Sequence, residues 1–130
     1  MKGAFLLALD PGLFEQAASV LVALGGERSP GDIDRVVQMP APAGRFFTLF
    51  ADLPPETVWE VREGPFEILD GVVAPDMSLV HACPFECADE VFASDIVARI
   101  AEATDSVRWI LDGDGVLWDA ATVDPAGLRL

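Results

Sequence analysis

An α+β fold, with a mainly antiparallel sheet and two helices packed on one of its faces, is the class that this 130-residue sequence predicts. Two segments repeat apolar residues at helical spacing, and several shorter segments are β-like and separated by glycine- and proline-rich turns. The segments follow one another in the order β-α-β-β-β-β-α-β-β, which favours a layered domain. The length suits a single domain over residues 1–130, and 52% hydrophobic residues suffice for a buried core.

The first predicted strand and helix lie within the first 26 residues. Residues 3–9 are uniformly apolar, which is typical of a strand covered on both faces. Asp10-Pro11 predicts a helix start, with the aspartate as N-cap and the proline at the first helical position. Apolar residues recur at helical spacing over residues 13–24, and Gly25-Gly26 predicts a left-handed stop.

Two strands are predicted next, over residues 33–39 and 45–52. The segment between them, residues 40–44, is rich in proline and alanine and is predicted as a connector. Pro54-Pro55 ends the second of these strands.

The middle of the chain continues the antiparallel run. Residues 57–62 alternate between apolar and charged side chains and are therefore predicted as a strand. Residues 66–74 fit either a short strand or a loop, and residues 77–83 are predicted as another strand.

The last predicted elements are a helix and a hairpin. The helix runs over residues 88–104, with Asp89 and Glu90 in its first turn, where the helix dipole favours acids. Residues 107–111 and 116–119 are predicted to pair as a hairpin across a Gly-Asp-Gly turn.

Charge is distributed very unevenly along the chain. The net charge is -14, and residues 52–95 carry eleven of the 22 acids but a single base, Arg62. Charge this uneven adds self-repulsion and does nothing for the fold, so we expect an anionic surface that binds a basic protein partner. The same acidity disfavours nucleic acid and anionic membranes as partners, because both attract clustered lysine and arginine.

The residues expected to contact the partner are acids of this stretch, acids of the Gly-Asp-Gly turn, and two tryptophans, a residue type enriched in binding hot spots. For the tryptophans, core burial is the alternative, and for the acids it is a purely solubilising role. The predicted contact residues are Trp59, Glu60, Glu63, Glu67, Asp70, Asp76, Glu86, Asp89, Glu90, Asp112, Asp114 and Trp118.

Residues 109–118, with the sequence WILDGDGVLW, resemble the first motif of the haloacid-dehalogenase-type phosphatases, a hydrophobic strand followed by Asp-x-Asp-Gly-Val. The resemblance implies a nucleophile at Asp112, an acid/base at Asp114 and bound Mg²⁺. That family needs the motif near the start of a parallel-sheet domain, whereas only 16 residues follow Asp114 here and none is a lysine. A hairpin turn accounts for the segment without any chemistry.

Metal and nucleophile chemistry have few candidate residues. His81, Cys83 and Cys87 offer three metal ligands, one fewer than a structural zinc site needs. His81 and Cys83 share a strand face as a possible dyad, but nothing nearby suggests an oxyanion hole. We therefore expect no enzyme activity, no metal and no cofactor, with reduced cysteines of which at least one packs as a small apolar side chain.

In overall character the chain is small, acidic and α+β, without a catalytic motif. In this it resembles the immunity proteins of bacterial polymorphic-toxin and contact-dependent inhibition systems. The resemblance covers the whole chain rather than any one motif, and it implies neutralisation of a cognate toxin by direct binding. The alternative is a small acidic secretion-chaperone-like or scaffold protein, which would be dimeric and would hold a partner segment along an apolar groove.

The expected location is the cytoplasm. No stretch reaches the roughly 20 apolar residues of a membrane span. The apolar start of the chain stops at Asp10-Pro11 with no small-residue cleavage site beyond it, unlike a signal peptide.

Overall fold

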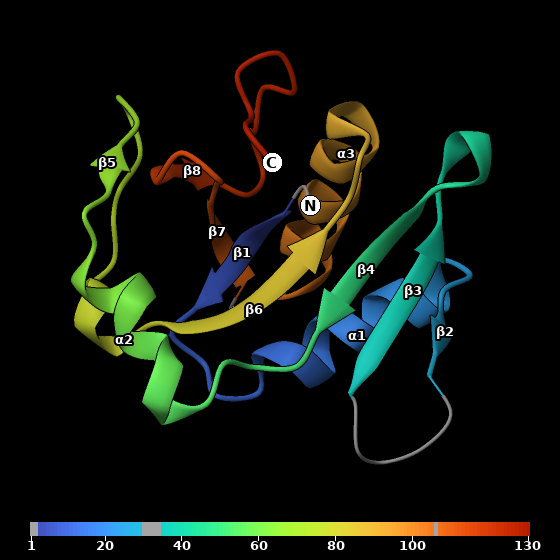
Figure 1. The fold of residues 1–130 in the computed structure, drawn as a ribbon, viewed down its shortest axis with the longest axis horizontal. Helices are drawn as coiled ribbons and strands as arrows, with labels where there is room; N and C mark the ends of the chain where they lie inside the picture. Colours follow the sequence, from blue (N-terminus) through green and yellow to red (C-terminus); the bar gives the residue numbers. More distant parts are fainter. Residues whose placement is uncertain (1–2, 30–34, 106) are drawn as a thin grey trace.

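The computed structural model describes residues 3–29, 35–105 and 107–130 (Figure 1). Within them the chain forms eight strands, three α-helices and two short 3-10 helices. The strands are β1 (Gly3–Ala8), β2 (Glu27–Arg28), β3 (Val36–Pro40), β4 (Phe46–Phe50), β5 (Glu67–Ile68), β6 (His81–Glu86), β7 (Val107–Leu111) and β8 (Val116–Asp119). The helices are α1 (Leu13–Ala23), α2 (Pro55–Glu63) and α3 (Glu90–Ala103), and the 3-10 helices are η1 (Pro42–Gly44) and η2 (Met77–Leu79).

A single sheet contains all the described strands, in the order β2-β3-β4-β6-β1-β7-β8-β5. The pairing of β5 with β8 is parallel, and the other pairings are antiparallel. The strand β1 pairs with β6 on one side and with β7 on the other. Because both of its partners come from the second half of the chain, the two halves are interlocked within the sheet.

A strand, a helix and then antiparallel strands follow one another twice along the chain, as β1-α1-β2-β3-β4, with three such strands, and as β6-α3-β7-β8, with two. Residues 51–80 join the two units and are called the connecting segment below. The connecting segment contains α2, β5 and η2. It is the part of the molecule in which the sequence-based predictions and the structure differ most.

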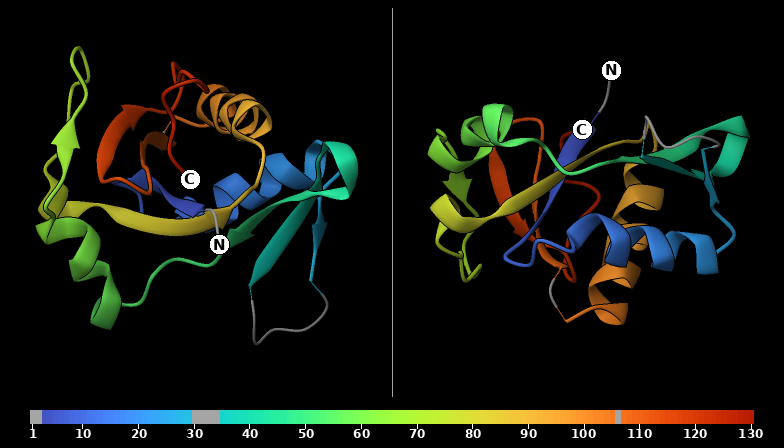
Figure 2. Two further views of the ribbon diagram at one scale, coloured as in Figure 1. Left: turned by 45° about the horizontal axis from the view of Figure 1, so that its top comes forward. Right: turned by 90° about the horizontal axis from the view of Figure 1, so that it is seen from below.

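The two faces of the sheet are covered differently. Figure 2 shows α1 and α3 together on one side of the sheet and α2 on the other. Side chains of β1 alternate accordingly, with Leu6 in the core under α1 and α3 and Leu7 in the core under α2. The first core includes a stacked pair of rings, Phe47 and Phe85, whose centroids lie 4.9 Å apart. The prediction of two helices on one face is therefore correct for α1 and α3.

The ends of α1 differ in how well they were predicted. The helix begins at Leu13 rather than at Pro11, and the carboxylate of Asp10 accepts hydrogen bonds from the Gly12 amide at 2.7 Å and from the side chain of Gln16 at 3.0 Å. At the other end, Gly25 has a φ of 106°, a left-handed conformation that favours glycine. The predicted left-handed stop is thus confirmed, whereas the predicted start is two residues early.

The prediction of a strand over residues 57–62 is wrong, because these residues belong to α2. Pro55 occupies a favourable first position of this helix, and Glu56 lies in its first turn. The buried pair is Val58 and Val61, three residues apart, which is a helical spacing. Six residues are too few to separate a period of 2 from a period of 3.6. The expected order with two helices is therefore corrected to three helices, with α2 on the opposite face.

Several other predicted elements have different bounds. Residues 77–83 contain η2 and the start of β6 rather than one strand, and residues 66–74 contain the two-residue β5. The strand predicted over residues 33–39 begins at Val36 as β3, while residues 33 and 34 lie outside the described residues.

The hairpin predicted near the end of the chain is confirmed as β7 and β8, and the second predicted helix is α3. The carboxylate of Asp89 caps α3 by accepting a hydrogen bond from the Phe92 amide at 3.0 Å. Among the described helices, none combines the length and the apolar character that crossing a membrane requires.

Candidate protein-binding surface

The exposed side of α2 carries three carboxylates around a tryptophan. Glu56, Trp59, Glu60 and Glu63 are spaced i, i+3, i+4 and i+7, so they lie along one face of the helix. Trp59 is 52% exposed. The opposite face, with Val58 and Val61, is buried against the sheet.

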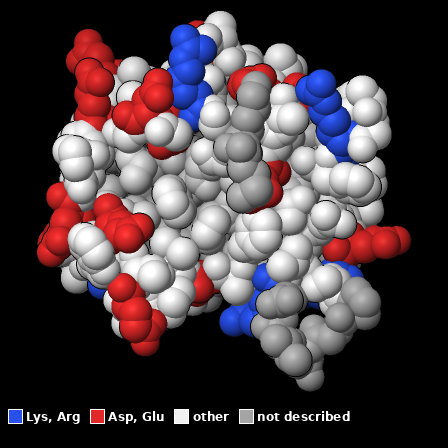
Figure 3. All heavy atoms as spheres, in the orientation of Figure 1, with Lys and Arg blue, Asp and Glu red and all other residues white. Residues whose placement is uncertain are grey.

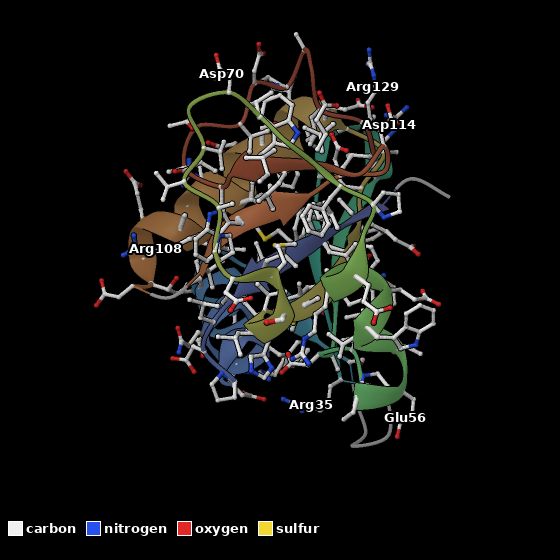
Figure 4. The ribbon with its side chains drawn as sticks, turned by 90° about the vertical axis from the view of Figure 1, so that its left-hand side faces the viewer. Arg35, Glu56, Asp70, Arg108, Asp114 and Arg129 are labelled. Carbon is white, nitrogen blue, oxygen red and sulfur yellow. The ribbon has the colours of Figure 1, made fainter. Side chains whose placement is uncertain are left out.

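Further carboxylates extend this face toward the end of the sheet. Glu67 in β5 and Asp70 in the turn that follows it are both exposed. Figure 3 shows acidic side chains gathered along the side of the molecule formed by α2 and β5. Seen from that side in Figure 4, Glu56 and Asp70 lie at opposite ends of it, and the labelled arginines lie at its margins.

Asp76 and Asp114 border the same region. Asp76 caps η2, and its carboxylate accepts hydrogen bonds from the hydroxyl of Ser78 at 2.6 Å and from the Ser78 amide at 3.0 Å, which hold the pKa of Asp76 below its usual value. Asp114 is exposed in the turn between β7 and β8, next to Gly115, whose carbonyl accepts the Glu67 amide. The α2–β5 surface is defined as Glu56, Trp59, Glu60, Glu63, Glu67 and Asp70, with Asp76 and Asp114 at its border.

The carboxylates of this surface have no cationic partner among the described residues. The ion pairs among the described residues lie outside this surface. They join Arg28 and Arg35 to Glu15, and Arg99 to Asp95. Arg62 is the only base in the connecting segment, and its Nε donates to the carbonyl oxygen of Val80 at 3.0 Å. Among the described residues, no arginine therefore forms an ion pair with a carboxylate of the surface.

Glu15, on α1, shows the opposite arrangement. Its carboxylate accepts hydrogen bonds from Arg35 at 2.9 Å and from Arg28 at 3.2 Å. The hydrogen bond from Arg35 is the main cause that lowers the pKa of Glu15. Arg35 also lies over the ring of Phe14, with its guanidinium carbon 4.7 Å from the ring centroid. Glu15 of α1 is thus paired with two arginines, whereas the glutamates of α2 form no ion pair with a described residue.

Apolar side chains are exposed in the same part of the chain. Besides Trp59, the connecting segment exposes Ile68 (47%), Val73 (85%) and Leu79 (59%). These are four of the eight large hydrophobic residues found exposed in the described chain, although the connecting segment is less than a quarter of its length. A patch that combines apolar side chains with charge is typical of a protein-binding surface.

Three predicted contact residues lie elsewhere. Glu86 ends β6, and Asp89 and Glu90 begin α3. At about 3.3 Å per residue, the length of β6 separates Glu86 from the α2 end of that strand by about 17 Å. Arg45 lies beside this second group and donates to the carbonyl oxygen of Ala88 at 3.2 Å. The acids of residues 52–95 therefore form two groups rather than one continuous platform.

Two of the predicted contact residues, Asp112 and Trp118, are buried rather than exposed on the α2–β5 surface. Asp112 is 4% exposed and Trp118 is 7% exposed. The Asp112 carboxylate accepts hydrogen bonds from the amides of Asp114 and Val116, both at 3.0 Å, from the indole of Trp118 at 2.9 Å and from the Arg129 amide at 3.4 Å. These bonds fix the β7–β8 turn and the end of the chain, as expected of a structural aspartate.

The cysteines are both free and buried. The thiol of Cys83 donates to the carboxylate of Asp52 at 2.9 Å, and burial, then this bond, raise the pKa of the thiol far above its usual range. Burial also raises the pKa of the Cys87 thiol. Such thiols are poor nucleophiles, because the thiolate is the reactive form. In the described chain no three His, Cys, Asp or Glu side chains are grouped as metal ligands.

An open depression of about 670 Å³ lies between α1 and the end of α3. Asp10, Glu15, Thr104 and Asp105 contribute to its lining, and it shares no residue with the α2–β5 surface. The carboxylates and the tryptophan of the α2–β5 surface thus lie outside this depression.

Sequence reasoning missed Glu56, Ile68, Val73 and Leu79 as members or neighbours of this surface. The signal for Glu56 was the Pro-Pro-Glu start of α2, which places that glutamate in a first helical turn. The three aliphatic residues carry no comparable signal, because an exposed and a buried aliphatic residue look alike in a sequence.

Comparisons of the chain with protein-family models, with curated proteins and with solved structures found no match.

Proposed function

We propose that this chain is an immunity protein, which binds a basic bacterial toxin domain through the α2–β5 surface and thereby neutralises it. The proposal places the complex in the cytoplasm and requires no cofactor and no catalytic residue. Free, buried thiols fit a reducing compartment. A nuclease-like or deaminase-like toxin carries a cationic cleft for nucleic acid, and an anionic protein surface complements such a cleft.

One observation carries this proposal: Trp59 is exposed between three glutamates that have no arginine partner among the described residues. Like charges at i, i+4, as in Glu56 and Glu60, destabilise a helix by about 0.2–0.5 kcal/mol per pair. Glu63 is also unfavourable, because it lies in the last turn, where the helix dipole favours cations. These three glutamates therefore lower the stability of α2 in the free protein. A partner that supplies positive charge beside them would offset this loss, which gives a reason for their presence.

The two kinds of side chain have separate roles in this proposal. The carboxylates accelerate the encounter with a cationic partner, by an effect that weakens as salt is added. Trp59, with Ile68 and Val73, supplies the apolar area that keeps the complex together, and therefore acts mainly on the dissociation rate.

The test compares two triple variants with the same change in net charge. The site variant combines Glu56→Gln, Glu60→Gln and Glu63→Gln. The control variant combines Glu27→Gln, Glu102→Gln and Asp105→Asn, three exposed acids outside the α2–β5 surface. The partner to be tested is the protein encoded by the open reading frame adjacent to that of this chain, with its rate of association measured at 50–500 mM NaCl.

We expect the site variant to associate about tenfold more slowly at low salt and with a flatter salt dependence, while the control variant stays within about twofold of the parent. Circular dichroism checks that both variants are folded. Equal effects of the two variants would mean that only net charge matters, and an unchanged rate in both would reduce the acidic surface to a solubility device.

A further inference from the structure

The outer edge of β5 is the end of the sheet. β5 follows β8 in the strand order and pairs in parallel with it. The amides of Glu67 and Leu69 donate to the carbonyl oxygens of Gly115 and Leu117, at 2.8 Å and 3.2 Å. Figures 1 and 2 show β5 at the outer end of the molecule, with β8 on its inner side.

The main chain of β5 therefore presents hydrogen-bonding groups on its outer side. Successive peptide groups of a strand point in opposite directions, so the amides and carbonyls of Phe66 and Ile68 are directed away from β8. In the part of the chain that the structure describes, no strand pairs with β5 on that side. An edge of this kind is a template for another strand.

Charge decides which strand can be added. Many edge strands are protected by lysine, but the connecting segment has none, and its edge strand contains Glu67 and is followed by Asp70. Adding β5 of a second copy would bring like charges together across the pair, which is unfavourable. A strand with lysine or arginine gains about 0.2–1 kcal/mol for each cross-strand pair of opposite charge.

We propose that β5 accepts an extended, basic segment of the partner protein as an additional strand of the sheet. Phe66 and Ile68 contribute the main-chain hydrogen bonds, and Glu67 and Asp70 select basic side chains. The exposed side chain of Ile68 contacts an apolar residue of the added strand. This inference rests on the proposed function and specifies how the partner is held once charge has brought it to the α2–β5 surface.

The first test uses two synthetic peptides on the unaltered protein. One is an acetylated and amidated hexapeptide of alternating lysine and valine, and the other has the same sequence with N-methyl groups on alternate residues. Both carry the same charge, but the methylated peptide cannot form a full edge of main-chain hydrogen bonds. We expect the unmethylated peptide to bind at least tenfold more tightly and to slow hydrogen exchange of the Ile68 amide.

The second test removes one outward amide from the protein. Ile68→Pro deletes an N–H that does not bond to β8, and proline is tolerated at such an edge position. Ile68→Val keeps the amide and serves as the matched control. We expect Ile68→Pro to abolish the difference between the two peptides and Ile68→Val to preserve it. Should Ile68→Pro fail to fold, the comparison of the peptides on the unaltered protein still decides the matter.

The outcomes separate this inference from the proposed function. Equal binding of the two peptides would overturn strand addition, because charge alone would then explain the attraction. That result would leave the proposed function standing, provided the site variant with three glutamines slows association with the toxin domain. A site variant without effect would overturn the proposed function, whatever the peptides show.

Discussion

The connecting segment and the α1–α3 side of the sheet are built differently. On the α1–α3 side, 23 buried residues of the described chain form one apolar cluster, which includes the stacked rings of Phe47 and Phe85. The cluster under α2 has eight buried residues, of which Val58 and Val61 come from the helix. Because burial of apolar area is the main source of stability, the first region carries the fold.

Besides its four buried residues in the smaller cluster and the pairing of β5 with β8, individual polar bonds hold the connecting segment to the sheet. The thiol of Cys83 donates to Asp52 at the start of the segment. Arg62 donates to the Val80 carbonyl, and the indole of Trp109 donates to the Val73 carbonyl at 3.0 Å. These bonds position a surface that has little core of its own. Exposed charge and exposed apolar side chains thus lie in the region that contributes less to the stability of the fold, as is usual for segments that carry function.

The largest expected effect comes from making the same substitution in both regions. Val97 in α3 and Val61 in α2 are both buried helical valines, at 0% and 2% exposure. Val97→Ala removes two methyl groups from a site enclosed by the larger cluster, and we expect it to lower the free energy of unfolding by about 2–3 kcal/mol. For Val61→Ala we expect about 1 kcal/mol, because the smaller cluster can close around the space. Urea denaturation measures both values.

Hydrogen exchange measures the same difference in stability between α2 and α3 at single amides. We expect amides of α2 to exchange through local opening at a lower free energy than amides of α3, which require global unfolding. Val61→Ala would then accelerate exchange in α2 and leave that in α3 nearly unchanged. Equal losses of stability in the two variants, with exchange accelerated everywhere, would show that the two regions form one cooperative unit.

A somewhat smaller loss of stability is expected at the β7–β8 turn, where the Gly115 carbonyl accepts the Glu67 amide of the connecting segment. Asp112→Asn replaces one acceptor oxygen by a donor and disturbs a carboxylate that accepts four hydrogen bonds. We expect a loss of about 2 kcal/mol, since a hydrogen bond to a charged group contributes about 1.5–3 kcal/mol. The exposed neighbour provides the control, because Asp114→Asn should change stability by less than about 0.5 kcal/mol.

The result also bears on the phosphatase resemblance. If Asp112→Asn proves as harmless as Asp114→Asn in urea denaturation, the carboxylate is not needed for the fold. A reactive role for Asp112 would then be worth testing with Mg²⁺ and a phosphate ester.

Much of the α1–α3 side could be predicted from the sequence. The apolar run of β1 is long enough to indicate a strand covered on both faces, and both faces are covered. The helix α3 has an apolar stripe over 14 residues and an aspartate cap, two independent signals that agree. Such elements are specified locally, so composition and periodicity suffice to find them.

The connecting segment could not be predicted in the same way. Its helix presents only two buried residues to the sheet, which is too short a pattern to reveal a period. The place of β5 depends on its pairing with β8, in which Ile68 lies opposite Leu117, 49 positions further along the chain. The sequence therefore indicated that carboxylates accumulate in this stretch, but not that those of α2 and β5 converge while Glu86, Asp89 and Glu90 lie elsewhere.

The last expected effect concerns the thiol at the start of the connecting segment and appears only at alkaline pH. The Cys83 thiol is buried against Asp52, and its pKa in the folded protein is raised above the ordinary value near 9. Above pH 9 the unfolded chain therefore binds fewer protons than the folded chain, and stability falls as pH rises. The slope for one group is at most about 1.4 kcal/mol per pH unit.

The composition makes this slope unusually easy to measure. The chain has no tyrosine, and the side-chain types with an ordinary pKa between about 8 and 11 are represented by two cysteines and one lysine. The pKa of Cys87 is also raised by burial, so both thiols contribute with the same sign. Cys83→Ser retains a donor for Asp52 but does not titrate, and we expect it to remove about half of the alkaline loss in urea denaturation from pH 8 to pH 10.5. An unchanged slope would mean that the Cys83 thiol ionises as freely in the folded protein as in the unfolded chain.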